Sequence, residues 1–158
     1  VRAQWQLTDP LAELALRWAA RLHEIGLDVA HSGYHRHGAY LLENADMPGF
    51  ARDEQLLLAR LVRFHRRKLA LEELDDLRAP WNQLAERLIV VLRLAVLLHR
   101  NRGNGHPPPF SLRPRGRGVV VRFKIRSLRR HPLTEADLQQ EQVHLKEHGI
   151  TLRIVMAT

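Results

Sequence analysis

The hydrophobic pattern of the chain changes once, near Arg102, and this change limits the possible folds more than any other feature. Up to that point apolar residues recur every three or four positions, which is typical of helices with one buried face. After Gly118 they alternate with polar residues, the period of a strand with one exposed face. We therefore predict a mainly α fold, with a helical bundle over residues 1–102, a basic Pro/Gly linker over 103–118 and a small α+β, strand-helix-strand subdomain over 119–158.

Four helices are expected in the first part of the chain. The first has a strong start signal, because Asp9 can accept a hydrogen bond at its beginning and Pro10 suits its first position. Gly26 is expected to end it, and Met47-Pro48-Gly49 breaks the chain after the second helix. The expected helices run from Pro10 to Ile25, Tyr34 to Glu43, Asp53 to Arg67 and Trp81 to Asn101.

The second part of the chain has the pattern of a small sheet with one helix. Two segments alternate apolar and polar residues, one from Val119 to Ile125 and the other from Ile150 to Met156. Thr134 is expected to cap the helix between them, and Gly149 is expected to stop it. Because two strands and a helix need another strand to be stable, Phe110 to Arg113 could form the first arm of a hairpin.

Composition excludes several classes of protein. The chain has no Cys, which rules out disulfides, zinc-thiolate sites and thiol catalysis and agrees with a cytoplasmic location. No run of about 18 apolar residues occurs, since even Leu88 to Leu98 is interrupted by Arg93, so no membrane span is expected. The chain begins at Val1 without a signal-peptide pattern, and we expect it to be a part of a longer protein.

Positive charge is concentrated in one region. The net charge is +8, and the segment from Arg87 to Thr134 holds twelve Lys or Arg residues and no Asp or Glu. Such a field attracts polyanions, with nucleic acid, acidic lipid and inorganic polyphosphate as the candidates. The alternative is that these arginines are solvent-exposed surface residues of an Arg-rich chain and bind no ligand.

Histidines are dense in the helical part of the chain. The group consists of His23, Glu24, His31, His35, His37 and His65. Imidazole and carboxylate groups suit Zn, Mn or Fe, so the group is a plausible raw metal site. Structural or surface roles are the alternative, because His23 and Glu24 lie at the end of the first helix, where a positive imidazole is favoured in any case.

Part of this group resembles the HD phosphohydrolase superfamily. The segment Trp18–Gly26, WAARLHEIG, is similar to the helix end whose His-Asp pair binds the catalytic metal in that superfamily. The positions that match its metal ligands are His23, Glu24, His37 and His65. Glu24 replaces the Asp of the pair, and Val96 stands where the last metal-binding Asp would be, although valine has no lone pair to donate. The resemblance implies an HD-like helical bundle with a degenerate metal site, no bound metal and no catalytic residue.

A narrower resemblance covers more of the chain. The segments Leu22–Phe50 and Leu61–Arg67 contain, in order, His-Ser-Gly, His-Arg-His, Met-Pro-Gly-Phe and Phe-His-Arg-Arg. They resemble the C-terminal HD-like domain of the exopolyphosphatase and guanosine pentaphosphate phosphatase family. The similarity is fair through Arg100 and weak after Arg102.

That resemblance implies different functions for different domains of the protein. It implies that catalysis takes place in N-terminal, actin-like domains of the same protein, with a divalent cation such as magnesium, and that this part has no cofactor of its own. It also implies a homodimer and a basic channel that holds inorganic polyphosphate while the end of the polymer is processed.

Arginine clusters support phosphate binding independently, because guanidinium groups bind phosphate oxygens in pairs and stay charged. One cluster lies at the end of the third helix, and the other lies around the linker. The second cluster also includes Arg113, Arg115 and Arg117. The expected polyphosphate-binding residues are Arg63, Arg66, Arg67, Lys68, Arg100 and Arg102. The alternatives are that the first cluster complements the helix dipole and that the second is a solvated loop.

Two other functions remain open at this level. An active HD-type, metal-dependent phosphohydrolase would use the four HD positions, against which Val96 counts. A nucleic-acid-binding module would use the acid-free block from Arg87 to Thr134. Only 6% of the residues are aromatic, and the basic loop contains just Phe110, so groups that could stack on bases are scarce.

Overall fold

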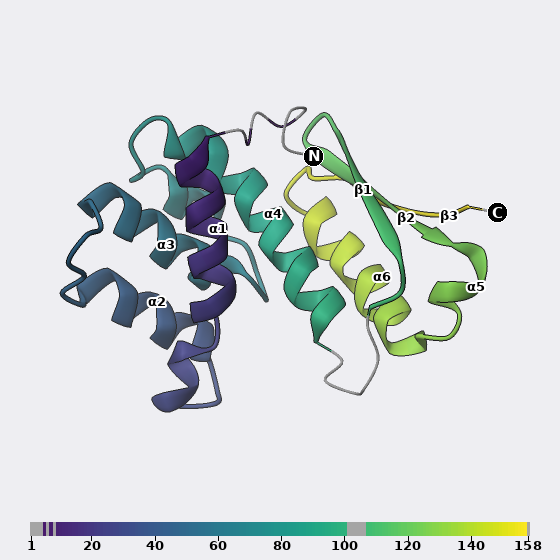
Figure 1. Cartoon of the computed structure of the whole chain (residues 1–158), viewed down its shortest axis with the longest axis horizontal. Coiled ribbons are helices and arrows are strands. Elements are labelled where there is room, and N and C mark those ends of the chain that lie inside the picture. Colours follow the sequence, from purple (N-terminus) through teal and green to yellow (C-terminus); the bar gives the residue numbers. More distant parts are fainter. Residues whose placement is uncertain (1–4, 6, 8, 101–106, 158) are drawn as a thin grey trace. The chain divides into compact units, whose positions relative to one another are not determined.

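The computed structural model describes residues 5, 7, 9–100 and 107–157, apart from the side chains of residues 125 and 126. The chain forms two compact units, one within Gln6–Leu94 and the other made of Val1–Trp5 and Ala95–Thr158. The first is helical and the second combines a sheet with helices (Figure 1). The mainly α fold class with a small α+β part is therefore confirmed, whereas the domain boundaries expected from the sequence stay predictions.

The helical unit is built from four α-helices and two short 3-10 segments in the described residues. The elements are α1 (Pro10–Leu22), η1 (Ile25–Asp28), α2 (Tyr34–Asn44), α3 (Arg52–Phe64), η2 (Leu71–Leu74) and α4 (Trp81–His99), the last of which continues into the other unit. The start of α1 is as predicted, because a carboxylate oxygen of Asp9 accepts a hydrogen bond of 2.8 Å from the backbone N–H of Leu11 and Pro10 takes the first position. None of the described helices combines the length and hydropathy that crossing a bilayer requires.

Gly26 has a different role from the one predicted. Helix α1 already ends at Leu22, and Gly26 lies inside η1. A Cβ atom on Gly26 would collide with the backbone carbonyl oxygen of Tyr34 and the backbone nitrogen of Gly38, both in α2. The glycine is therefore needed because η1 lies against the backbone of α2, not because a helix stops there.

Helix α3 is the centre of this unit. It packs against both α1 and α2, and Leu57, Leu58 and Leu61 on its inner face are fully buried. Helix α4 is joined to the end of α3 by buried Arg93, whose guanidinium donates a hydrogen bond of 2.8 Å to the carbonyl oxygen of Phe64. The end of α3 is thus held in place by packing on one side and by a charged hydrogen bond on the other.

Helix α3 ends earlier than the predicted end at Arg67. Its last helical residue is Phe64, and Arg67 has a φ of 65°, in the left-handed region that a helix cannot contain. The ring of His65 donates from Nδ1 to the carbonyl oxygen of Val62 at 2.7 Å. That carbonyl would otherwise accept from the backbone N–H of Arg66, so the imidazole replaces the next helical hydrogen bond.

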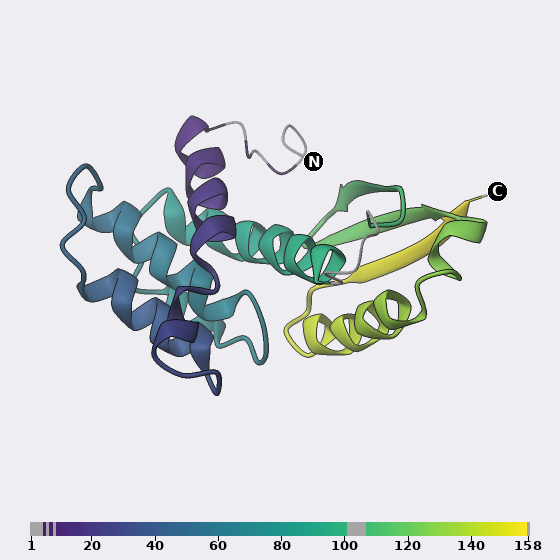
Figure 2. The same ribbon diagram turned by 60° about the horizontal axis from the view of Figure 1, so that its bottom comes forward.

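The second unit is a three-stranded sheet with helices on one face. Its elements are β1 (Phe110–Arg115), β2 (Gly118–Lys124), α5 (Ile125–Leu128), α6 (Pro132–Lys146) and β3 (Leu152–Ala157). The strand order is β1-β2-β3, with β1 antiparallel and β3 parallel to β2. Helix α6 lies along one face of the sheet and contacts β3, while α5 contacts β2 (Figure 2).

The hairpin arm predicted from Phe110 is present as β1, which extends two residues further, to Arg115, inside the segment predicted as a linker. The predicted cap at Thr134 is wrong, because α6 begins at Pro132 and Thr134 is a buried residue within the helix. The Pro ring fixes the backbone angle that a first helical residue needs, so the helix begins three positions earlier than a cap at Thr134 would give.

Candidate functional site

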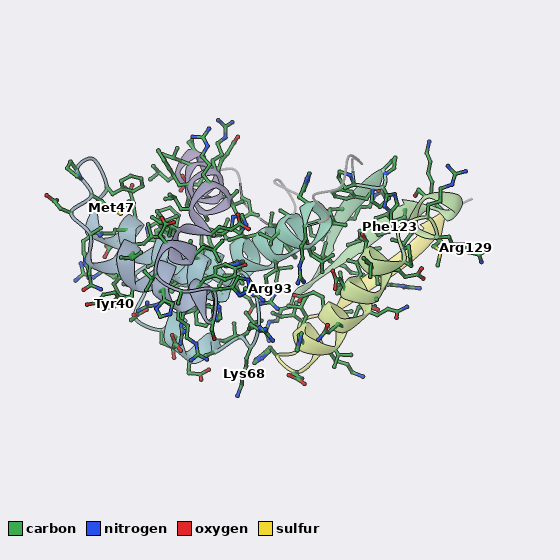
Figure 3. The ribbon with its side chains drawn as sticks, turned by 90° about the horizontal axis from the view of Figure 1, so that it is seen from below. Tyr40, Met47, Lys68, Arg93, Phe123 and Arg129 are labelled. Atoms are coloured by element: carbon green, nitrogen blue, oxygen red, sulfur yellow. The ribbon has the colours of Figure 1, made fainter. Side chains whose placement is uncertain are left out.

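The cations at the end of helix α3 and directly after it form the densest basic segment of the helical unit. Four of the six residues from 63 to 68 are Arg or Lys. Because the backbone turns at Arg67, the last two, Arg67 and Lys68, leave the direction of the helix and are exposed. Figure 3 shows Lys68 extending away from the ribbon. This segment, residues 63–68, is called the α3 basic end below.

The first two cations of the α3 basic end are held by neighbours. The guanidinium of Arg63 lies 3.4 Å from the carboxylate of Glu73, in η2. The guanidinium of Arg66 lies over the ring of Tyr34, 4.7 Å from its centroid. A guanidinium that lies over an aromatic face still has the N–H donors at its own edge available to a ligand. The sequence prediction missed Tyr34, and the only signal for it was its place on the first turn of a helix rich in His and Arg.

The element that carries Glu73 is itself anchored. Arg60, on α3, donates hydrogen bonds to the carboxylates of Glu43 and Asp76 and to the carbonyl oxygen of Glu73. Burial opposes the charge of Arg60, but these two carboxylates outweigh it and raise the pKa of Arg60 above its ordinary value. The segment that faces the α3 basic end is therefore fixed by a permanent positive charge.

One residue of the α3 basic end, His65, belongs to a cluster of aromatic rings. His65 is in the middle, with the ring centroids of His23, Tyr34 and His35 at 5.2, 5.7 and 6.4 Å from its own. His65 is 2% exposed and His35 is 8% exposed. His65 Nε2 and His35 Nδ1 are buried and have no hydrogen-bond partner. The structure thus brings together His23 and His65, two of the four HD positions, and adds His35.

Both buried imidazoles are uncharged at neutral pH. Burial lowers the pKa of His65 to about 3, although the hydrogen bond to the carbonyl of Val62 opposes the shift. Burial and then the positive charge of Arg66 lower the pKa of His35 to about 4. Since a carbonyl can only accept a hydrogen bond, the proton of neutral His65 is on Nδ1 and its Nε2 carries a free lone pair.

The structure does not assemble the four HD positions into a metal centre. In residues 9–100 and 107–157 no three His, Asp or Glu side chains lie together in a way that could hold a metal ion. His37 and Glu24 are only partly buried, and Val96 supplies no ligand in place of an Asp. The donor set therefore does not fit an HD-type metal, and the expectation of a degenerate site stays a prediction.

The two other predicted phosphate-binding residues belong elsewhere. Arg100 lies in the second unit, is exposed and has a guanidinium nitrogen 3.9 Å from the carboxylate of Asp137. Arg102 lies outside the described residues. The geometry thus supports one compact basic segment, the α3 basic end, and leaves the linker cluster as a prediction.

The sequence of the chain matches a class of phosphatase domains. The family model of Ppx/GppA phosphatase, domain III, matches residues 1–142. The chain belongs to the Ppx/GppA phosphatase family. This confirms the resemblance drawn from the sequence.

Relatives named guanosine-5'-triphosphate,3'-diphosphate pyrophosphatase are similar to the chain over most of its length. The protein of Photobacterium profundum is 36% identical over 146 residues, which are 92% of this chain and 29% of the relative. That of Vibrio atlanticus is 34% identical over 152 residues, 96% of this chain and 30% of the relative. The chain therefore spans less than a third of the length of these relatives.

Proposed function

We propose that this chain holds inorganic polyphosphate for a phosphohydrolase whose catalytic step takes place in other domains of the same protein. The observation that carries the proposal is the α3 basic end, where four cations occur within six residues. Membership of the Ppx/GppA phosphatase family supports a phosphate-rich ligand.

The arrangement of the four cations suits a polymer of phosphates. Arg66 is pre-positioned on the ring of Tyr34, and Arg67 and Lys68 follow it in exposed positions. Guanidinium groups can bind two phosphate oxygens at once. Each exposed contact is weak and screened by salt, so a chain of repeated anions gains more from several cations than a single phosphate does.

The remaining parts of the proposal follow from the family. Catalysis is assigned to N-terminal, actin-like domains with a divalent cation, as the resemblance of the chain to this family implies. Dimerisation would double the number of cationic contacts available to one polymer and so raise its effective affinity. A cytoplasmic location is part of the same proposal.

A second candidate ligand is guanosine pentaphosphate. It is favoured by the name of the relatives, which are guanosine-5'-triphosphate,3'-diphosphate pyrophosphatases. The α3 basic end could hold its phosphates in the same way, but a short ligand would contact fewer cations. Competition against long polyphosphate at equal phosphate concentration distinguishes the two candidates.

The test is calorimetric titration of the chain with long polyphosphate. Replacing Arg66, Arg67 and Lys68 by Gln should weaken binding about tenfold, because three contacts contribute about 0.5 kcal/mol each. The matched control replaces Arg17, Arg21 and Arg78, which are exposed cations elsewhere in the helical unit, and should change the affinity little. Equal losses in both triple variants would show that only net charge matters and would contradict the proposed site.

A further inference from the structure

The face of the small sheet that points away from α6 is strongly basic. In β2 the buried residues Val119, Val121 and Phe123 face the helices, because α5 and α6 cover that side. Residues of a strand alternate between faces, so Val120, Arg122 and Lys124 lie on the opposite side. This second side is called the outer face below.

The strand register places more cations on the outer face. Val120 is paired with Arg113 of β1 and with Arg153 of β3, and Arg115 of β1 pairs with Gly118. Residues paired across strands point to the same side of a sheet. The cations of the outer face are Arg113, Arg115, Arg122, Lys124 and Arg153, all of them exposed.

These cations have no negative counterpart in the sheet. None of the three strands contains an Asp or Glu, and the described residues include no ion pair to any of the five. Strands lie about 4.8 Å apart, so Arg113 and Arg153, on either side of Val120, are about 10 Å apart at their backbones. Like charges at this spacing repel one another, and a bound polyanion removes the repulsion.

The outer face lacks the groups that recognise bases. The two aromatic residues of the hairpin, Phe110 and Phe123, pair with each other on the opposite side, with ring centroids 6.1 Å apart. The apolar residues of the outer face are Val120, Val155 and Ala157, all partly buried. Single-stranded nucleic acid gains much of its affinity from stacking on aromatic rings, so this face favours an anion that consists of phosphates alone.

We infer that the outer face of the sheet is a second polyphosphate-binding surface, separate in the sequence from the α3 basic end. The inference rests on the proposed function, because it assigns the same ligand to a second set of residues. A long polymer can contact all five cations of the outer face at once, whereas a short one meets fewer of them. The outer face therefore makes the affinity depend on polymer length.

The test replaces Arg113, Arg122 and Arg153 by Gln in the full chain. The matched control replaces Arg129, Arg130 and Lys146, which are exposed cations of the same unit outside the sheet. Long polyphosphate and tripolyphosphate are the probes, and circular dichroism checks that each variant is folded. The outer-face variant should bind long polyphosphate about tenfold more weakly, with a smaller effect on tripolyphosphate, and the control should resemble the wild type.

The outcomes separate this inference from the proposed function. If the variant with Arg66, Arg67 and Lys68 replaced by Gln loses affinity and the outer-face variant does not, the inference of a second surface is wrong and the proposed function stands. If the wild-type chain does not bind polyphosphate at all, both are wrong. If the outer-face variant loses affinity for an RNA oligonucleotide but keeps its affinity for polyphosphate, the occupant is nucleic acid and the inference is overturned.

Discussion

Two buried bases, His35 and His65, make the folded chain sensitive to acid. Their pKa values in the folded state are about 4 and about 3, whereas an unfolded chain has the ordinary value of about 6.5. Between these values the unfolded state binds more protons, so the free energy of unfolding rises with pH. The stability is present above about pH 6.5 and is lost as the pH falls toward the folded-state pKa values.

Replacing His65 by Asn should remove part of this acid sensitivity. The amide does not titrate, yet it can still donate a hydrogen bond toward the carbonyl of Val62. With a pKa of about 3 in the folded state, His65 accounts for about 2 kcal/mol of unfolding free energy lost between about pH 7 and about pH 5. Urea unfolding at both pH values measures it. The exposed residue His31 provides the control, and His31→Asn should keep the wild-type pH dependence.

An equal loss of stability in wild type and His65→Asn would show that the imidazole titrates normally in the folded chain. The sequence alone could not indicate this behaviour, because His23, His35 and His65 meet only through the packing of three separate segments.

At the level of elements, local signals in the sequence predicted the starts of α1 and α3 better than their ends. Asp9 and Pro10 mark the start of α1 through a hydrogen bond and a fixed backbone angle, both of which depend on neighbours in the chain. The end of α3 depends on the His65 side chain taking the carbonyl of Val62, and on buried Arg93 from α4. Such contacts come from the tertiary fold, so the periodicity extended the helix too far.

The same distinction applies to the two basic surfaces. The α3 basic end is contiguous in sequence, and its four cations were predicted as a group. The outer face joins Arg113 and Arg153 through the register of three strands. A one-residue shift in register would send one of them to the buried side, so the alternation of a single strand could not reveal it.

Gly26→Ala tests the close approach of η1 to α2. The added Cβ would meet backbone atoms of Tyr34 and Gly38, which cannot move without displacing the helix. We expect a loss of about 2 kcal/mol or more in unfolding free energy, measured by urea unfolding. The control is Gly38→Ala, whose Cβ would come nearest to the side chains of Val62 and Ile25 at 3.1 and 3.2 Å and to the backbone nitrogen of Gly26 at 3.3 Å.

Gly38→Ala should be milder, because its contacts are all longer than 3.0 Å, whereas a Cβ on Gly26 would overlap the carbonyl oxygen of Tyr34. Ala also favours a helix over Gly by about 1 kcal/mol. If the two variants lost the same unfolding free energy, tight packing in general would account for the effect of Gly26→Ala. Its explanation by backbone contact between η1 and α2 would then be wrong.

At the level of the whole molecule, charge is the property that both proposed surfaces share. The α3 basic end and the outer face belong to different units, and each would release counterions from a bound polymer. The logarithm of the affinity for long polyphosphate should fall linearly with the logarithm of the salt concentration.

The slope of that line counts the cations in contact with the polymer. Each triple Gln variant at a proposed surface should reduce the slope by about 2 to 3, and the two together by about twice as much. The control triples should reduce it by less. A slope that is the same in all variants would mean that polyphosphate is held elsewhere. Titrations at several salt concentrations provide the measurement.

The parallel pairing of β2 with β3 has a consequence for the order of folding. The β1–β2 hairpin needs only a short turn, whereas a parallel strand has to wait for the crossover through α5 and α6. Arg153 therefore joins the outer face only when the long-range pairing of β2 with β3 has formed. A ligand that requires the complete face binds the finished fold better than any partly folded chain, so it shifts the folding equilibrium toward the native state. Such a ligand would therefore stabilise the native fold that holds it.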